Sequence, residues 1–87
     1  MKTFWLETTD PDLVMCVPEL ADGEIVAIDC SDPDVRDYYE PPEPLAFDLS
    51  ACAALQDEVL EEAQAILSEL NPALALTGRM AITRTRD

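Results

Sequence analysis

The chain of 87 residues contains no histidine, so it lacks the side chain that most often serves as a general base near neutral pH. Its two glycines, Gly23 and Gly78, are far apart, so there is no glycine-rich loop to surround a phosphate group. Carboxylate pairs remain as acid–base groups, but 19 acidic residues bring such pairs together by chance. We therefore expect no enzymatic activity, no catalytic residue and no cofactor.

Cysteine is scarce, and its three copies, Cys16, Cys30 and Cys52, are widely spaced. An odd number without a CxxC pair excludes a dense disulfide scaffold and a typical zinc site. We interpret the three as reduced thiols that pack as small hydrophobic groups. A reactive thiol is the alternative, and acidic surroundings oppose it because they raise a thiol pKa.

No apolar run approaches the ~18 residues that a membrane-spanning helix needs. The first residues contain one lysine and a short apolar stretch followed by Glu7, which is not the pattern of a signal peptide. The sequence therefore predicts a soluble, cytoplasmic protein that does not bind membranes.

Basic residues are also few, with five against 19 acidic ones, for a net charge of −14. Residues 21–48 hold nine acids and one arginine, and residues 49–70 hold five acids and no base. Only residues 71–87 reverse the sign, with three arginines against one aspartate. Such a surface attracts cationic partners and repels nucleic acid and anionic lipid, so we expect direct binding to neither.

The hydrophobic content of 48% is ordinary for a folded protein, and the length suits one domain, residues 1–87. Residues 2–8, 13–17, 24–30 and 79–85 are rich in β-branched, aromatic and other apolar side chains, which predicts four strands. The run 13–17 suits a strand buried on both faces or an edge strand that ends at Pro18. The short connection to 24–30 predicts a hairpin.

Residues 49–70 have the spacing of an amphipathic helix, which Asp48 or Ser50 would cap and Asn71 with Pro72 would end. Residues 73–77 are rich in alanine and leucine, and Gly78 is expected to interrupt them. The order β-β-β-α-β predicts an α+β fold, a small, mostly antiparallel sheet with one amphipathic helix packed on one face. The predicted apolar line of the helix is Leu49, Cys52, Leu55, Val59, Ala63, Ile66 and Leu70.

Residues 31–46 contain four prolines among acids and predict a long acidic loop. Within it the sequence is compatible with polyproline II character at 40–44 and with a short helical turn at 34–39. Four acids of this loop, Asp32, Asp34, Glu40 and Glu43, match ligand positions of a calcium-binding loop. Arg36 and Asp37 break that pattern, because they stand where a ligand and a glycine are required. We therefore expect no metal site.

The polar side of the predicted helix carries no compensating base, since no lysine or arginine lies between Arg36 and Arg79. Like charges four residues apart each cost an isolated helix ~0.2–0.5 kcal/mol. The acids either serve only solubility or form an interface for a basic partner. Over a helical rise of ~18 Å they give about one charge per ~4 Å, close to the ~3.4 Å of one DNA strand. These candidate contact residues are Asp57, Glu58, Glu61, Glu62 and Glu69.

The acidic loop supplies a second candidate contact, because two adjacent tyrosines lie among its acids. Tyrosine is frequent among interface hot spots, and an acidic loop suits a partner that presents arginine. The alternative is that one ring packs on the core and the other is exposed without a role. The loop candidates are Asp34, Asp37, Tyr38, Tyr39, Glu40 and Glu43.

In size and composition, and in no motif, the chain is similar to the small acidic DNA-mimic proteins that phages use against restriction and CRISPR systems. That resemblance implies an inhibitor or modulator of a basic, nucleic-acid-binding protein. The alternative is a structural or antitoxin- or immunity-like subunit of a complex without mimicry. A third interpretation is adaptation to high salt, which would place acids on all faces.

Overall fold

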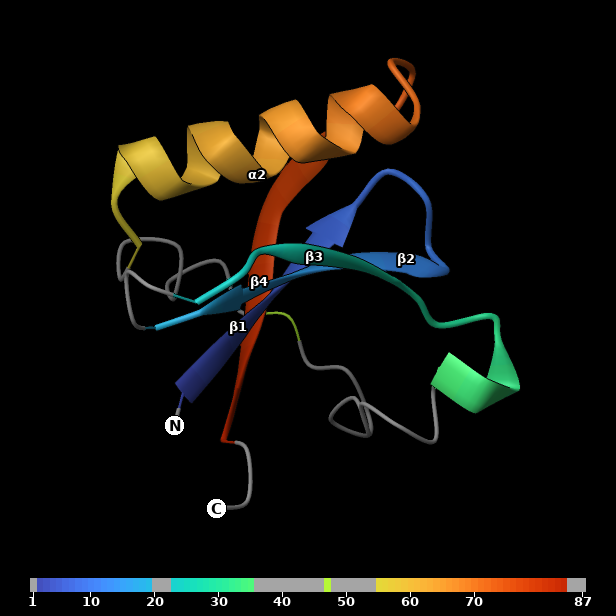
Figure 1. Ribbon diagram of the computed structural model, residues 1–87, viewed down its shortest axis with the longest axis horizontal. Coiled ribbons are helices and arrows are strands. Elements are labelled where there is room, and N and C mark those ends of the chain that lie inside the picture. Colours follow the sequence, from blue (N-terminus) through green and yellow to red (C-terminus); the bar gives the residue numbers. More distant parts are fainter. Residues whose placement is uncertain (1, 20–22, 36–46, 48–54, 85–87) are drawn as a thin grey trace.

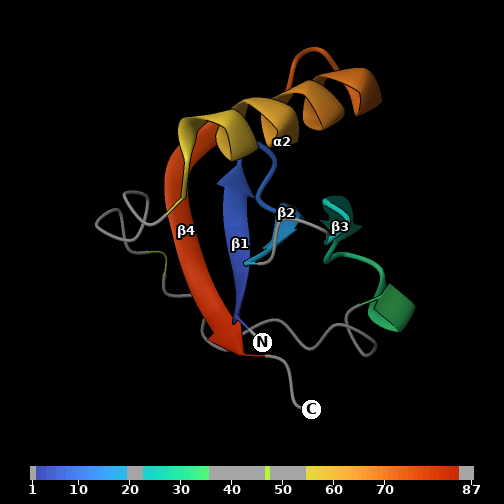
Figure 2. The same ribbon diagram turned by 60° about the vertical axis from the view of Figure 1, so that its left-hand side comes forward.

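The computed structural model describes residues 2–19, 23–35, 47 and 55–84, and the fold is described for these residues. Four strands form one sheet: β1 (Lys2–Thr8), β2 (Leu13–Pro18), β3 (Val26–Asp29) and β4 (Leu76–Arg84). Their order is β3-β2-β1-β4, every neighbouring pair is antiparallel, and β4 and β3 lie at the two edges (Figure 2). One helix, α2 (Asp57–Leu70), precedes β4 in the chain (Figure 1). The predicted α+β class and element order are confirmed.

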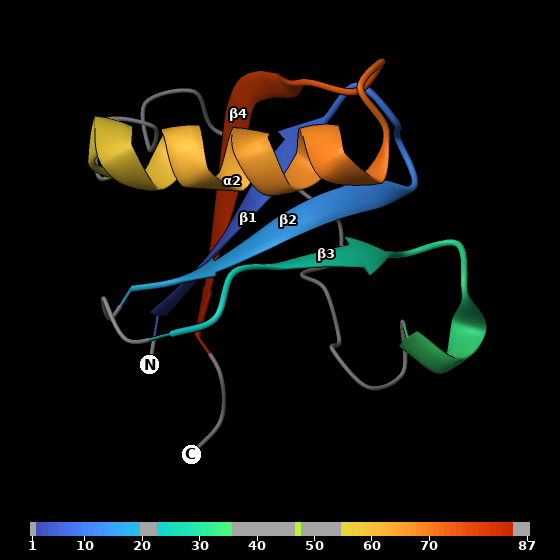
Figure 3. The same cartoon turned by 45° about the horizontal axis from the view of Figure 1, so that its top comes forward.

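Helix α2 covers one face of the sheet and crosses in front of β4 and β1 (Figure 3). Alternate residues of β1 point to this face, and Phe4 and Leu6 are paired with Val17 and Met15 of β2. The buried cluster beneath the helix consists of Phe4, Leu6, Met15, Val17, Ala63, Leu67 and Met80. The period of two along each strand thus builds this layer of the core.

The opposite face of the sheet has its own buried cluster around Trp5, which pairs with Cys16 and Ala81. Val35 and Phe47, from the segment between β3 and α2, pack against this cluster. Successive residues of β2, such as Val14 and Met15, are therefore both buried. Of the two predictions for residues 13–17, the strand buried on both faces is confirmed.

The helix begins later than the sequence predicts. Leu55 and Gln56 are not helical, and Gln56 precedes the first turn in an extended conformation (φ −73°, ψ 148°). Its side chain makes no capping hydrogen bond. The prediction of a helix from residue 49 capped by Asp48 or Ser50 is therefore wrong at its start, although residues 48–54 themselves lie outside the described part. Acids in the first turn, Asp57 and Glu58, favour this end through the helix dipole.

The end of the helix agrees with the sequence, because Asn71 leaves the helical conformation and its N–H bonds the Leu67 carbonyl at 3.0 Å. The face toward the sheet is centred elsewhere than predicted. Ala63 and Leu67 are buried, whereas Leu70, assigned to the apolar line, is 60% exposed. The apolar side of α2 is wider than the single row of residues that was predicted. The row through Val59 and Leu70 lies at one edge of that side, and the sheet covers its centre.

Strand β4 starts at Leu76 and runs through Gly78, so the expected interruption at this glycine is wrong. Leu6 pairs with Met80 and Thr8 with Leu76, which leaves Glu7 opposite the three residues 77–79. The extra residues form a β-bulge, and Gly78 adopts φ +87°, which a residue without a Cβ accepts at little cost. The glycine therefore redirects the strand without ending it.

The predicted strand at 24–30 is shorter in the structure, because only Val26–Asp29 pairs with β2. Within the predicted loop 31–46, residues 33–35 form a helical turn near the start of the expected 34–39 turn. Residues 36–46, including the predicted polyproline II stretch at 40–44, lie outside the described residues.

We predict that Leu67→Ala lowers the free energy of unfolding by about 3 kcal/mol, because it leaves a cavity under the helix. Urea denaturation followed by circular dichroism measures this change. Leu70→Ala is the matched control, since it makes the same substitution one turn later at an exposed position and should change stability by less than about 0.5 kcal/mol. Equal losses in the two variants would contradict the described packing of α2.

Candidate functional site

The five acids predicted on the helix share one exposed surface, here called the acidic face of α2. At ~100° per residue they span an arc of ~140° directed away from Ala63 and Leu67. No hydrogen bond or ion pair within the described part of the chain engages any of these carboxylates. The acidic face consists of Asp57, Glu58, Glu61, Glu62 and Glu69.

The one cation among the described side chains is Arg79, and it is occupied elsewhere. Its guanidinium lies 3.5 Å from the Glu7 Oε2 atom, donates to the Phe47 carbonyl at 3.3 Å, and sits 5.7 Å from the centre of the Phe47 ring. Partial exposure limits the strength of this ion pair. The pairing nevertheless directs the arginine away from α2, so the acidic face receives no counter-charge from it.

The β-bulge in β4 makes this pairing possible, because it places two polar side chains of β4 against one carboxylate of β1. The Thr77 hydroxyl donates to Glu7 Oε2 at 2.8 Å, and Arg79 contacts the same oxygen. Glu7, which lies opposite the bulge, is therefore held by a hydroxyl and a guanidinium. No other ion pair joins two described side chains.

The structure places Asp34, a candidate of the acidic loop, apart from the acidic face of α2. Asp34 is exposed in the helical turn at 33–35, and its N–H bonds the Asp32 Oδ1 atom at 3.0 Å. The next residue, Val35, packs against the face of the sheet opposite α2. Asp34 therefore does not extend the acidic face of α2 into a continuous surface with the loop candidates. The other loop candidates, Asp37, Tyr38, Tyr39, Glu40 and Glu43, lie outside the described residues.

A second acidic area, which the sequence analysis did not single out, lies where the β1–β2 turn meets the segment after β3. The Cys30 N–H donates to the Asp12 carbonyl at 2.6 Å, which joins the two segments. Asp29 accepts from the Ser31 hydroxyl at 2.5 Å and from its N–H at 3.0 Å. These bonds lower the pKa of Asp29 and keep it ionised. They complete turns, and no three acids or thiols of the described residues converge as metal ligands.

Cysteine chemistry is disfavoured at the one described thiol with a resolved pKa. Cys16 is half-buried on the face of the sheet that Val35 and Phe47 cover, and burial raises its pKa to about 11. Cys30 is buried in the same apolar cluster. Their surroundings support the interpretation as small hydrophobic groups, whereas Cys52 lies outside the described residues.

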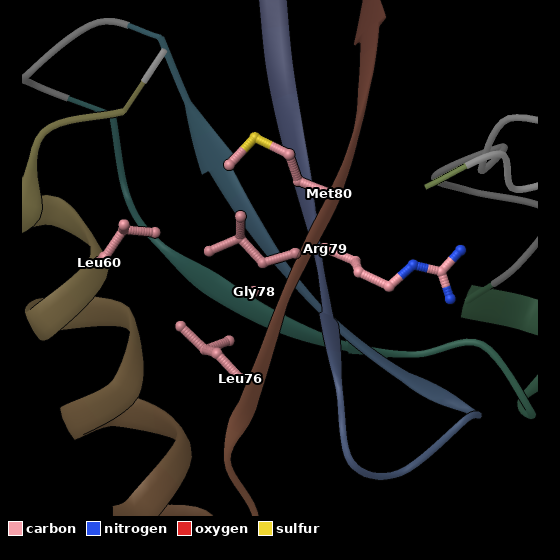
Figure 4. A pocket seen from close by; sticks show the side chains of 6 residues that line it. Leu60, Leu76, Gly78, Arg79 and Met80 are labelled. Atoms are coloured by element: carbon pink, nitrogen blue, oxygen red, sulfur yellow. The ribbon is translucent and has the colours of Figure 1, made fainter. Parts of the chain in front are cut away.

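Sequence reasoning missed a small apolar cavity between α2 and β4, here called the edge cavity (Figure 4). Its volume is about 60 Å³. Leu60 was absent from the predicted apolar line, and Gly78 was read as a break, so no sequence signal joined the two elements. The residues that line the cavity are Leu6, Leu60, Leu76, Gly78, Arg79 and Met80.

The side chain of Gln64 fixes the distance between α2 and β4 near this cavity. Its Oε1 atom accepts from the Leu76 N–H at 2.8 Å, and its Nε2 atom donates to the Leu74 carbonyl at 3.3 Å and to the Ser68 hydroxyl at 3.1 Å. The amide group thus bridges the helix and the start of the strand. The side of α2 that carries Gln64 is therefore the side that faces β4.

Helices within the described ranges are too short or too polar to cross a bilayer. No protein-family model, curated protein or solved structure matches the chain.

We predict that iodoacetamide at pH 8 modifies Cys16 more than about tenfold more slowly in the folded protein than in urea, because the raised pKa reduces the thiolate fraction. Mass spectrometry of Glu-C peptides after timed quenching resolves the rate at each cysteine, because Glu19 and Glu24 separate Cys16 from Cys30. The same chain in urea is the control for intrinsic reactivity. Equal rates in both conditions would show that Cys16 is not shielded.

Proposed function

We propose that the chain is a small acidic binding protein that inhibits or modulates a basic protein, one that itself binds nucleic acid. The contact would be the acidic face of α2, whose carboxylates would occupy a cationic groove in place of phosphates. The observation that carries this proposal is the exposure of all five carboxylates without a cationic partner among the described side chains.

These carboxylates destabilise the free helix through mutual repulsion, and a cationic partner would remove that repulsion on binding. Asp57 and Glu61, and likewise Glu58 and Glu62, are like-charge pairs four residues apart, each of which costs the helix ~0.2–0.5 kcal/mol. A lysine at either position of a pair would turn this cost into a gain of similar size. A cationic surface relieves the same repulsion on binding, and the net charge of −14 speeds its approach.

The main alternative is a subunit of a complex, such as an antitoxin- or immunity-like partner, that is held by apolar contacts. Two large hydrophobic side chains favour this alternative: Leu70 is 60% exposed and Ile82 is 42% exposed. The two proposals differ in their response to salt. Binding through carboxylates weakens steeply as salt rises, whereas binding through an apolar interface does not.

We predict that Glu62→Lys with Glu69→Lys weakens partner binding roughly tenfold or more at ~0.1 M salt, because it reverses two charges of the acidic face. The same change should keep or raise the thermal midpoint. The first new lysine would follow Glu58 by four residues in the favourable order, and the second would lie in the last turn of α2, where the helix dipole favours a cation. Differential scanning calorimetry measures this part of the prediction.

The control variant is Glu19→Lys with Glu24→Lys, which changes the net charge equally at two exposed positions outside α2. The binding assay is affinity capture from a nuclease-treated lysate of the producing cells, with elution by duplex DNA or by a salt gradient. Proteins with cationic clefts should be released by both, and the control should still capture them. If both variants lose the same binding affinity, the net charge and not the acidic face of α2 is responsible for binding. If the captured protein is released by neither salt nor DNA, the alternative of a subunit held by apolar contacts is favoured.

A further inference from the structure

The edge cavity lies beside β4, the last strand of the sheet, so no further strand of the described residues covers its outer side. Leu60 extends from α2 toward Leu76 and Met80 of β4, whereas Arg79 points away from the cavity toward Phe47 (Figure 4). The lining is almost entirely apolar. A water molecule there would find few hydrogen-bond partners, so an aliphatic group is the better occupant.

Two acids of α2, Asp57 and Glu61, lie within one helical turn of the cavity residue Leu60. Asp57, Glu61, Gln64 and Ser68 follow one another at steps of three and four, so they form one stripe along the helix. Gln64 bonds Leu74 and Leu76, so the stripe lies along the border between the acidic face of α2 and the side of the helix that faces β4. Asp57 and Glu61 belong to the N-terminal half of the stripe, beside Leu60, and neither carboxylate has a partner among the described residues.

We propose that the edge cavity receives one aliphatic side chain of the basic partner, a leucine or a methionine flanked by arginine or lysine. This inference rests on the proposed function and names the chemistry of the segment that the chain recognises. The argument for a flanked aliphatic residue is complementarity. The wall residue Leu60 of the apolar cavity of about 60 Å³ is followed in α2 by Glu61 and lies one helical turn after Asp57, two exposed acids without a partner among the described residues.

The carboxylates and the edge cavity would contribute differently to recognition. The carboxylates attract and orient the cationic segment, which sets the rate of association. The buried aliphatic group adds affinity that salt does not screen, and it distinguishes one basic segment from another. A DNA mimic without such an anchor would bind every cationic groove of suitable width.

The test uses two peptides that differ at one residue, Ac-Arg-Arg-Leu-Arg-Arg-NH2 and Ac-Arg-Arg-Gln-Arg-Arg-NH2, titrated into the 15N- and methyl-labelled protein at low salt. We expect the leucine peptide to bind about fivefold or more tightly, as the burial of a few apolar carbons implies. Its methyl shift changes should concentrate at Leu60, Leu76 and Met80. The glutamine peptide should shift mainly amides of the acidic face.

Two variants fill the cavity from different walls, Leu60→Phe and Leu76→Phe. If one of them folds poorly, the other still tests the inference. Either should reduce the affinity for the leucine peptide to that of the glutamine peptide while leaving the latter unchanged. Ile66→Phe is the matched control, because it enlarges a half-buried residue of α2 that does not line the cavity. The preference for leucine should persist in this control.

The outcomes separate this inference from the proposed function. If both peptides bind equally and Glu62→Lys with Glu69→Lys weakens both, the acidic contact stands and the anchored side chain is wrong. A preference for leucine that survives both cavity-filling variants would also overturn the inference. If neither peptide binds at low salt, the inference fails together with the electrostatic basis of the proposed function.

Discussion

The burial of Ala63 and Leu67 against the sheet is the interaction on which the rest of this structure depends. A fully buried leucine contributes about 1.5–3 kcal/mol, whereas each like-charge pair on the outer side of α2 costs ~0.2–0.5 kcal/mol. The apolar contact therefore exceeds the repulsion and holds an uncompensated acidic helix in place. Met15 and Met80 of the sheet are fully buried in the same cluster as Ala63 and Leu67, and their flexible side chains suit irregular space between a helix and a sheet.

The second constraint is the β-bulge opposite Glu7, which determines the position of the Arg79 guanidinium. Glu7 and Arg79 are 72 residues apart in the chain, and the two extra residues of β4 bring Thr77 and Arg79 to the same carboxylate. The positive φ of Gly78 permits this local geometry. A regular strand would have placed other side chains opposite Glu7. The position of the Arg79 charge thus follows from one irregularity in the sheet.

Strands were predictable because their signal is local. The aromatic and β-favouring residues at 2–8 and the continuous apolar run at 13–17 are recognisable without knowledge of distant contacts, and both strands lie where the sequence indicated. The start of the helix was less predictable, because Asp48 and Ser50 are suitable caps in isolation and the sequence does not show that Leu55 and Gln56 leave the helical conformation. Gly78 was misread for a similar reason, since a glycine that interrupts a strand and one that forms a bulge look alike until the partner strand is known.

The sequence by itself determined the α+β class, the net charge of −14 and the absence of any base on α2, because composition and short-range periodicity need no knowledge of distant contacts. Only the tertiary structure decided that Asp34 lies on the side of the sheet away from α2, that Arg79 pairs with Glu7, and that Leu60 and Leu76 enclose the edge cavity. Each of these depends on residues far apart in the chain. Their proximity is fixed by strand order and register, which follow from the packing of the whole core and not from any local pattern.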